Sequence, residues 1–272
     1  MKFALVEGKR REAQPSLSGK CPVCGDAMIA RCGKHKVRHW AHRGTRNCVP
    51  WWEPETEWHR AWKNQFPREW QEVPHRSEDG EWHFADVKTE SGIVIEFQHS
   101  PLRRDERESR EIFYQRMVWV VNGLRRVRDR AQFFASLAVV RFKPLTVSLP
   151  SNEGALLRDW GASRVPVYFD FGVSEPGDTL RIGPTALSLR FDTPILWRLN
   201  PCSPNGRAYL SAVEKTSFLD AHLKGQRLKG IDWSAAAVEC ARSLLAQQGP
   251  QPGGLTGFER FMAMERRTRR RF

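Results

Sequence analysis

The chain has 272 residues, of which 40% are hydrophobic, enough for a sizeable core in one large domain or two small ones. Its formal net charge of +13 favours a polyanion, nucleic acid first of all, as the partner, and makes a membrane surface the weaker alternative. No apolar run approaches the roughly 18 residues that span a bilayer, and the first residues become charged too early for a secretory signal. We therefore expect a cytoplasmic protein with no membrane partner.

Four of the six cysteines lie between residues 21 and 48, among several histidines. Cys21 and Cys24 form a CxxC motif, and Gly25 behind them tolerates a tight turn. A tetrahedral structural Zn²⁺ needs two further ligands. The histidines of the His-Trp-Ala-His motif can complete the site, or one of them can do so with a later cysteine. The candidates are His39, His42 and Cys48.

Hydrophobic periodicity predicts an order of helix, strand, strand, helix, strand and helix in the middle of the chain. The two strands flank a Thr-Glu-Ser-Gly turn, which is typical of a β-hairpin. The expected helices cover 55–66, 103–116 and 124–137, and the expected strands cover 81–88, 93–99 and 117–121.

The second half carries no marked chemistry. It reads as strands at 165–171, 186–191 and 194–199 and helices near 208–223 and 233–246. A Gly/Pro/Gln-rich linker then leads to a basic tail, which either binds DNA or is only a solvated charge run. The tail arginines are Arg266, Arg267, Arg269, Arg270 and Arg271. We therefore expect four segments. They are the Cys/His segment 1–50, the α/β core 51–145, a strand-rich and then helical region 146–247, and the linker with the basic tail 248–272.

The predicted hairpin carries a polar constellation. Strand alternation places Glu96 and Gln98 on one face, opposite a partner strand that carries Asp86. Two carboxylates across a hairpin repel each other in a site of low dielectric, so a divalent cation is their natural companion. The less specific interpretation is that these are ordinary charges of a surface hairpin.

The first predicted helix repeats Glu55, His59 and Lys63 at intervals of four, so an acid, an imidazole and an ammonium share one face. Glu55 can add a carboxylate to a metal, while His59 and Lys63 can hold a phosphate or orient the attacking water. The same pattern also fits a solvated face with ion pairs. The alternating charges of 103–111 favour a salt-bridged helix over a DNA contact, and Arg110 is expected to pack near the site.

The motifs of the middle of the chain, together with the preceding Cys-Pro-x-Cys and His-Trp-Ala-His motifs, resemble those of the competence protein CoiA-like family. The resemblance covers about residues 18–125. In chain order the motifs of the middle of the chain are Trp51-Trp52-Glu53-Pro54-Glu55-Thr56-Glu57-Trp58-His59 with Trp62-Lys63, His83-x-Ala85-Asp86-Val87, Glu96-Phe97-Gln98-His99-Ser100, Arg110 with Tyr114, and Trp119-Val120-Val121-Asn122-Gly123.

The resemblance implies an α/β (α+β) fold: a restriction-endonuclease-like mixed sheet flanked by helices, with a small N-terminal zinc module and a strand-rich, then helical, C-terminal extension. It implies that Asp86, Glu96 and the Phe97 carbonyl bind Mg²⁺ or Mn²⁺. Gln98 then stands where PD-(D/E)xK nucleases carry lysine. Glutamine can only orient by hydrogen bonds, so either the metal together with Lys63 or Lys88 substitutes for the missing charge, or catalysis is slow or lost.

Two functions follow from these patterns. The first is metal-dependent cleavage of DNA phosphodiesters, linked to the handling of incoming DNA. The second is a catalytically weak or inactive DNA-binding accessory module that works with recombination or defence proteins. The departure at Gln98 is the sequence feature that separates them.

Overall fold

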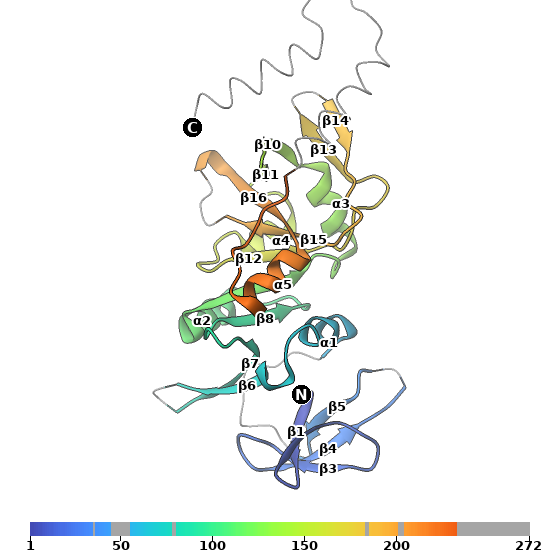
Figure 1. Cartoon of the computed structure of the whole chain (residues 1–272), viewed down its shortest axis with the longest axis vertical. Helices are drawn as coiled ribbons and strands as arrows, with labels where there is room; N and C mark the ends of the chain where they lie inside the picture. Colours follow the sequence, from blue (N-terminus) through green and yellow to red (C-terminus); the bar gives the residue numbers. More distant parts are fainter. Residues whose placement is uncertain (35, 45–54, 78–79, 183–184, 201–203, 233–272) are drawn as a thin grey trace, which may run out of the picture. The chain divides into compact units, whose positions relative to one another are not determined.

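The computed structural model describes residues 1–34, 36–44, 55–77, 80–182, 185–200 and 204–232, which form a mixed α/β fold rich in sheet (Figure 1). The chain divides into two compact units. The first consists of Met1–Arg126, Ala162–Asp170 and Leu219–Arg227, and the second contains the remaining residues. The predicted segment 1–50 lies within the first unit, whereas the predicted segment 51–145 is divided, with residues 51–126 in the first unit and residues 127–145 in the second.

The first unit begins with a five-stranded antiparallel sheet in the order β2-β1-β3-β4-β5. Sequence patterns alone had not indicated these strands, because each is short and carries few β-branched residues. Trp40 and Met28 pack at the centre of its small core, together with Cys21. The strands are β1 (Phe3–Val6), β2 (Lys9–Glu12), β3 (Ser18–Lys20), β4 (Ala27–Arg31) and β5 (His39–His42).

The second sheet of this unit is mixed, in the order β12-β9-β8-β7-β6. Strands β8, β9 and β12 run parallel to one another, while β7 pairs antiparallel with both β6 and β8. The predicted helices and strands occur in the predicted order, with shorter helices, but the structure adds the strand β6 between the first helix and the hairpin, which the sequence patterns do not predict. The elements are α1 (Glu57–Lys63), η1 (Arg68–Trp70), β6 (Gln71–Arg76), β7 (Trp82–Lys88), β8 (Val94–Gln98), α2 (Arg104–Tyr114), β9 (Met117–Asn122) and β12 (Val167–Asp170).

Helices α1 and α2 each anchor on this sheet. The Trp62 ring of α1 stacks on Phe97 of β8, with 5.4 Å between ring centroids. From α2, the Glu111 carboxylate accepts a hydrogen bond from the Trp119 indole of β9. Strands β8 and β9 are buried along their whole length. Each has a neighbouring strand on both of its edges, and the helices α1 and α2 pack on them.

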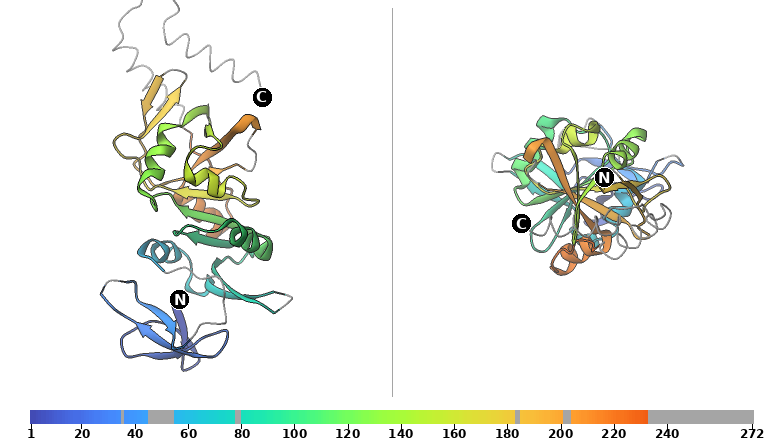
Figure 2. Two further views of the ribbon diagram at one scale, coloured as in Figure 1. Left: turned by 180° about the vertical axis from the view of Figure 1, so that it is seen from behind. Right: turned by 90° about the horizontal axis from the view of Figure 1, so that it is seen from above.

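The second unit holds a run of strands in the order β14-β13-β10-β11-β16-β15, and β13 and β14 form the gold antiparallel pair in Figure 2. Phe133, Phe171 and Trp197 pack in its aromatic core. Its elements are α3 (Val127–Ala135), β10 (Ala138–Phe142), β11 (Leu145–Pro150), α4 (Gly154–Trp160), β13 (Thr179–Ile182), β14 (Thr185–Ser188), β15 (Ile195–Leu199), η2 (Pro204–Gly206) and β16 (Arg207–Glu214); α5 (Lys215–Lys224) begins here and ends in the first unit.

The helix expected over 208–223 is wrong in its first half, where β16 pairs with both β11 and β15. The burial of Arg207–Glu214 alternates with the period of a strand, although its Ala and Leu content suits a helix. Pairing on both edges outweighs that weak local preference. The helix expected at 233–246, the linker and the basic tail lie outside the described residues. Within the described part, no helix is long and apolar enough to cross a bilayer.

Candidate functional site

Strands β7 and β8 separate where their acidic residues stand. Their antiparallel register covers Val87 with Ile95 and Lys88 with Val94. At the next position the backbone N–H of Phe97 donates to the Asp86 carboxylate at 3.0 Å, and the backbone N–H of Asp86 donates to the Glu96 carboxylate at 3.1 Å. The two side chains thus take the place of ladder bonds. This brings the predicted acids together in a fork of the sheet.

The fork is short of positive charge. The Glu96 side chain is 4% exposed, and the Asp86 side chain, at 23%, is more open to solvent. Burial, followed by the charge of Asp86, raises the pKa of Glu96 to about 8, although Arg110 of α2 lies 3.3 Å from its carboxylate. Burial also raises the pKa of Asp86. Full ionisation of both acids therefore needs a further cation.

Lys63, at the end of α1, supplies the nearest ammonium. Its Nζ lies 2.9 Å from an oxygen of Glu55, 2.9 Å from an oxygen of Glu72 and 3.7 Å from an oxygen of Asp86. Burial alone would lower the pKa of Lys63, but the three carboxylates together raise it above its usual value. Lys63 therefore stays charged at neutral pH and does not act as a proton acceptor. Its charge helps to hold the Asp86 side chain in place.

Glu72, the first charged residue of β6, is a central member that sequence analysis missed. Its carboxylate accepts hydrogen bonds from the backbone N–H groups of Lys2 at 2.7 Å and Phe3 at 3.1 Å, as well as from Lys63. Burial opposes its ionisation, but the Lys63 ammonium holds the pKa of Glu72 at about 2. The backbone groups that it binds lie about 70 residues away in the chain, so no local pattern could have indicated this contact.

Two residues of the predicted helix face, Glu55 and His59, make contacts within the fold. Glu55 precedes α1, and its two oxygens accept from Arg60 at 2.9 and 2.8 Å and also meet Lys63. His59 Nδ1 lies 2.9 Å from the Thr56 hydroxyl, and its Nε2 donates to the Phe97 carbonyl at 2.9 Å. Both ring nitrogens are therefore occupied, so the expected phosphate contact of His59 needs a rearrangement. The Phe97 carbonyl already accepts one hydrogen bond.

Gln98 stands two residues after Glu96 and shares its strand face. The side chain is 2% exposed, and its Nε2 donates to the carbonyl of Ser100 at 3.0 Å. Its Oε1 is buried and has no hydrogen-bond partner among the residues that the structure describes. A buried amide oxygen without a donor carries a desolvation cost that a cation or a bound donor removes.

Helix α2 confirms the expectation of internal ion pairs. Arg104 pairs with Glu108, and Arg107 pairs with Glu111. Arg110 reaches Glu96, as expected from its predicted place near the site.

A second acid that the sequence analysis missed is Asp170, at the end of β12. Its carboxylate accepts hydrogen bonds from the indole groups of Trp58 at 3.2 Å and Trp62 at 2.8 Å, and so fixes α1 on the sheet.

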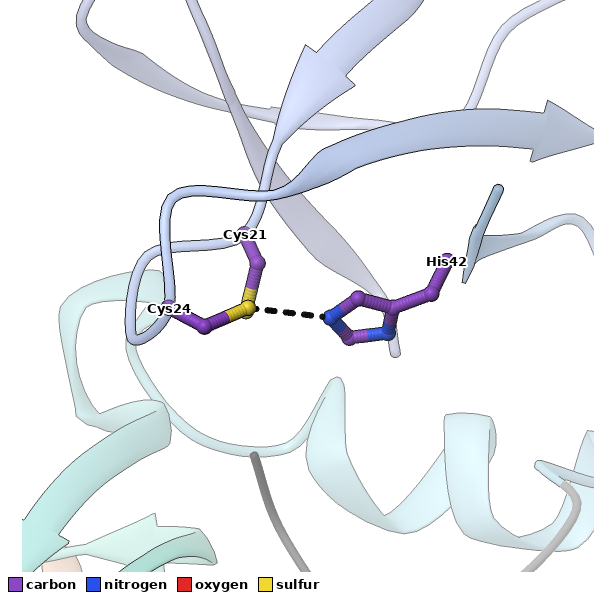
Figure 3. A group of neighbouring side chains, drawn as sticks. All are labelled: Cys21, Cys24 and His42. Carbon is purple, nitrogen blue, oxygen red and sulfur yellow. Dashed lines mark hydrogen bonds between the residues drawn. The ribbon is translucent and has the colours of Figure 1, made fainter. Parts of the chain in front are cut away.

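The N-terminal sheet carries a separate group of ligands. Cys21 and Cys24 lie in the turn before β4 and His42 lies at the end of β5, and their ligand atoms are all within 4.8 Å of one another (Figure 3). His39 differs: its Nδ1 lies 2.8 Å from the Val37 carbonyl, and strand alternation puts it on the other face from His42. Cys48 lies outside the described residues. Cys21, Cys24 and His42 can therefore hold a metal ion.

We predict that Lys63→Met lowers the free energy of unfolding by about 3–5 kcal/mol, because it leaves buried carboxylates without their shared cation. Lys88→Met on β7 is the matched control, since the Lys88 side chain is partly exposed and a Lys-to-Met change there should cost much less. Urea denaturation of both variants measures the difference. Equal losses would show that the buried carboxylates do not depend on Lys63.

Comparison of the chain with known proteins finds no relative. No family model matches the chain, and no curated protein and no solved structure matches it either. The function is therefore argued from the residues and their geometry.

Proposed function

We propose that the chain is a metal-dependent nuclease that cleaves DNA phosphodiesters on a restriction-endonuclease-like core. The single observation that carries this proposal is the fork of β7 and β8, where Asp86 and Glu96 meet beside Lys63. Two acids at a break in a sheet ladder cost stability, since their pKa values are raised. Cation binding is a function that explains why the chain keeps them together.

The donor atoms of the fork fit a hard divalent cation such as Mg²⁺ or Mn²⁺. Asp86 and Glu96 offer carboxylate oxygens, and Gln98 offers the buried amide oxygen that has no donor among the described residues. Such cations take oxygen ligands from carboxylates and amides. When bound, the ion would polarise the scissile phosphate and favour ionisation of an attacking water.

The other residues have positioning roles in this proposal. Lys63 favours the ionised form of Asp86 and holds this side chain in place, because the ammonium is itself held by Glu55 and Glu72. His59 fixes the backbone between Glu96 and Gln98 through the Phe97 carbonyl. Lys63 is nevertheless buried and already surrounded by acids, so a direct contact with the phosphate is not assigned to it. The bound ion would supply the charge that lysine gives in PD-(D/E)xK nucleases.

The resemblance to CoiA-like proteins supports the same proposal and adds a setting, the handling of incoming DNA in the cytoplasm. The second candidate function is an inactive DNA-binding module. Gln98 favours it, because glutamine replaces the usual lysine, and so does the binding of both Glu96 oxygens by protein groups. The basic tail, which lies outside the described residues, is a DNA contact in both proposals.

We expect Asp86→Asn and Glu96→Gln each to lower the rate of DNA cleavage at least about 100-fold, because each removes an anionic ligand for the ion. Cleavage of labelled single- and double-stranded DNA with Mg²⁺ or Mn²⁺ measures this effect. Glu90→Gln in the β7–β8 turn and Asp105→Asn on α2 are matched exposed controls and should keep the wild-type rate. Wild-type protein without activity in every divalent ion would leave the binding module as the function.

Gln98→Lys probes the departure from lysine in the same assay. Equal or higher activity would show that glutamine only occupies the position of the usual ammonium. A large loss would show that its amide oxygen is needed. The thermal midpoint of each variant with and without Mn²⁺ separates loss of the ion from loss of the fold.

We further propose that Cys21, Cys24 and His42 bind one structural Zn²⁺, with Cys48 as the fourth ligand. Two thiolates and an imidazole at this spacing suit zinc, and a site closed by four protein ligands stabilises a small module. His39 is the weaker fourth candidate, because its ring faces Val37 on the opposite side of β5.

Metal analysis should find one zinc per chain, and Cys24→Ser should remove it and lower the thermal midpoint. Cys24 is exposed, so the loss would come from the metal and not from core packing. Cys32→Ser, in the same module but outside the ligand group, is the control and should retain the zinc. Cys48→Ser and His39→Asn identify the fourth ligand. Purified protein without zinc would contradict the proposal.

A further inference from the structure

The N-terminal sheet and α1 line a cleft that the candidate metal sites do not use. It has a volume of 910 Å³ and is formed by β2, Gly33, Lys34 and Lys36–Arg38, residues of α1, and Arg68. Its lining contains eight lysines and arginines and two glutamates. Six of these cations are exposed, namely Lys9, Arg11, Lys34, Lys36, Arg38 and Arg68.

The exposed cations of the cleft are not neutralised from within the described part of the chain. Of the two acids in the lining, Glu12 lies 3.2 Å from Arg60 and 3.7 Å from Lys2, which leaves only Glu57 facing six exposed cations. None of the six forms an ion pair with a described carboxylate. Like charges gathered in a concave surface repel one another, and a bound polyanion relieves that repulsion.

Side-chain contacts hold one wall of the cleft in place. The guanidinium groups of Arg10 and Arg68 lie 4.5 and 4.9 Å from the ring centroid of Phe3. Arg68 also donates to the carbonyl of Arg10 at 3.0 Å. These contacts hold β2 against the segment before β6, so the cations Lys9 and Arg11 on either side of Arg10 in β2 have a fixed backbone position.

The cleft is joined by direct contacts to the candidate catalytic fork. Arg60 lines the cleft and binds Glu55. Glu55 binds Lys63, which lies 3.7 Å from Asp86. A single phosphate would meet only a few of the exposed cations. A chain of phosphates at regular spacing can meet cations spread over two elements of the cleft.

We propose that this cleft binds the sugar-phosphate backbone of a nucleic-acid strand and so holds the substrate of the first unit. The inference rests on nucleic acid as the partner in the proposed function, but not on cleavage. It assigns the binding to the N-terminal sheet and α1, in addition to the C-terminal arginines.

The test compares two full-length variants of equal net charge. The first combines Arg11→Gln, Lys34→Gln and Arg38→Gln in the cleft, and the second combines Lys20→Gln, Arg31→Gln and Arg116→Gln at exposed positions of the same unit outside its lining. Binding of a fluorescent single-stranded oligonucleotide is measured by anisotropy over a series of salt concentrations, without divalent ions. Thermal midpoints and zinc content verify that both variants are folded.

The cleft variant should bind more weakly, and the slope of log K against log salt should become shallower by about 2, because three phosphate contacts are lost. The control should match the wild type. Equal losses in both variants would reduce the effect to net charge and overturn the proposal, as would an unchanged slope in the cleft variant. Equal displacement by poly-glutamate would assign the cleft to an acidic protein instead. The two proposals can fail separately. If the cleft variant binds the oligonucleotide like the wild type while Asp86→Asn and Glu96→Gln still lose cleavage, only the cleft proposal fails. If the cleft variant binds more weakly while Asp86→Asn and Glu96→Gln cleave like the wild type, only the nuclease proposal fails.

Discussion

The first unit depends on one buried ammonium. Lys63 is 3% exposed and meets Glu55 before α1, Glu72 in β6 and Asp86 in β7. Three acids so close together cannot all remain ionised away from water without a shared cation. The contact of Lys63 therefore fixes where α1 lies on the sheet, and it allows acidic residues to stand inside the fold.

The fork between β7 and β8 exists because side chains replace backbone acceptors. A regular ladder would give the N–H groups of Asp86 and Phe97 carbonyl partners on the opposite strand. Here the carboxyl groups of Glu96 and Asp86 accept these bonds instead. The interruption opens the sheet at the point where the acids gather. Structure and proposed chemistry thus come from the same hydrogen bonds.

The N-terminal sheet is joined to this site by charge and not by apolar packing alone. Glu72 accepts from the backbone of Lys2 and Phe3, and it shares Lys63 with Asp86. Arg60 adds a second link, between Glu12 of β2 and Glu55. A ligand group for a metal in that sheet can therefore stabilise the unit that carries the fork. The cleft between β2 and α1 follows from the same connections.

Several features could be predicted from the sequence because their causes are local. The alternation of Ile95, Glu96 and Phe97 indicates a strand with acids on one face, and the CxxC of Cys21 and Cys24 indicates a metal-ligand turn. Hydrophobic periods of two and of 3.6 residues also predict the helices α1, α2 and α3 and the strands β7, β8 and β9 to within a few residues, but not β6.

Other features were decided only by the tertiary structure, because their partners are distant in the chain. Glu72 is marked by no motif, yet it joins Lys2 to Lys63. The equal spacing of Glu55, His59 and Lys63 suggests one chemical face, but Phe97 engages His59 and only Lys63 reaches Asp86. The His-Trp-Ala-His motif suggests two ligands, whereas a strand turns His39 and His42 to opposite faces. Sequence spacing fixes which side chains can share a face, and only long-range pairing determines what each face meets.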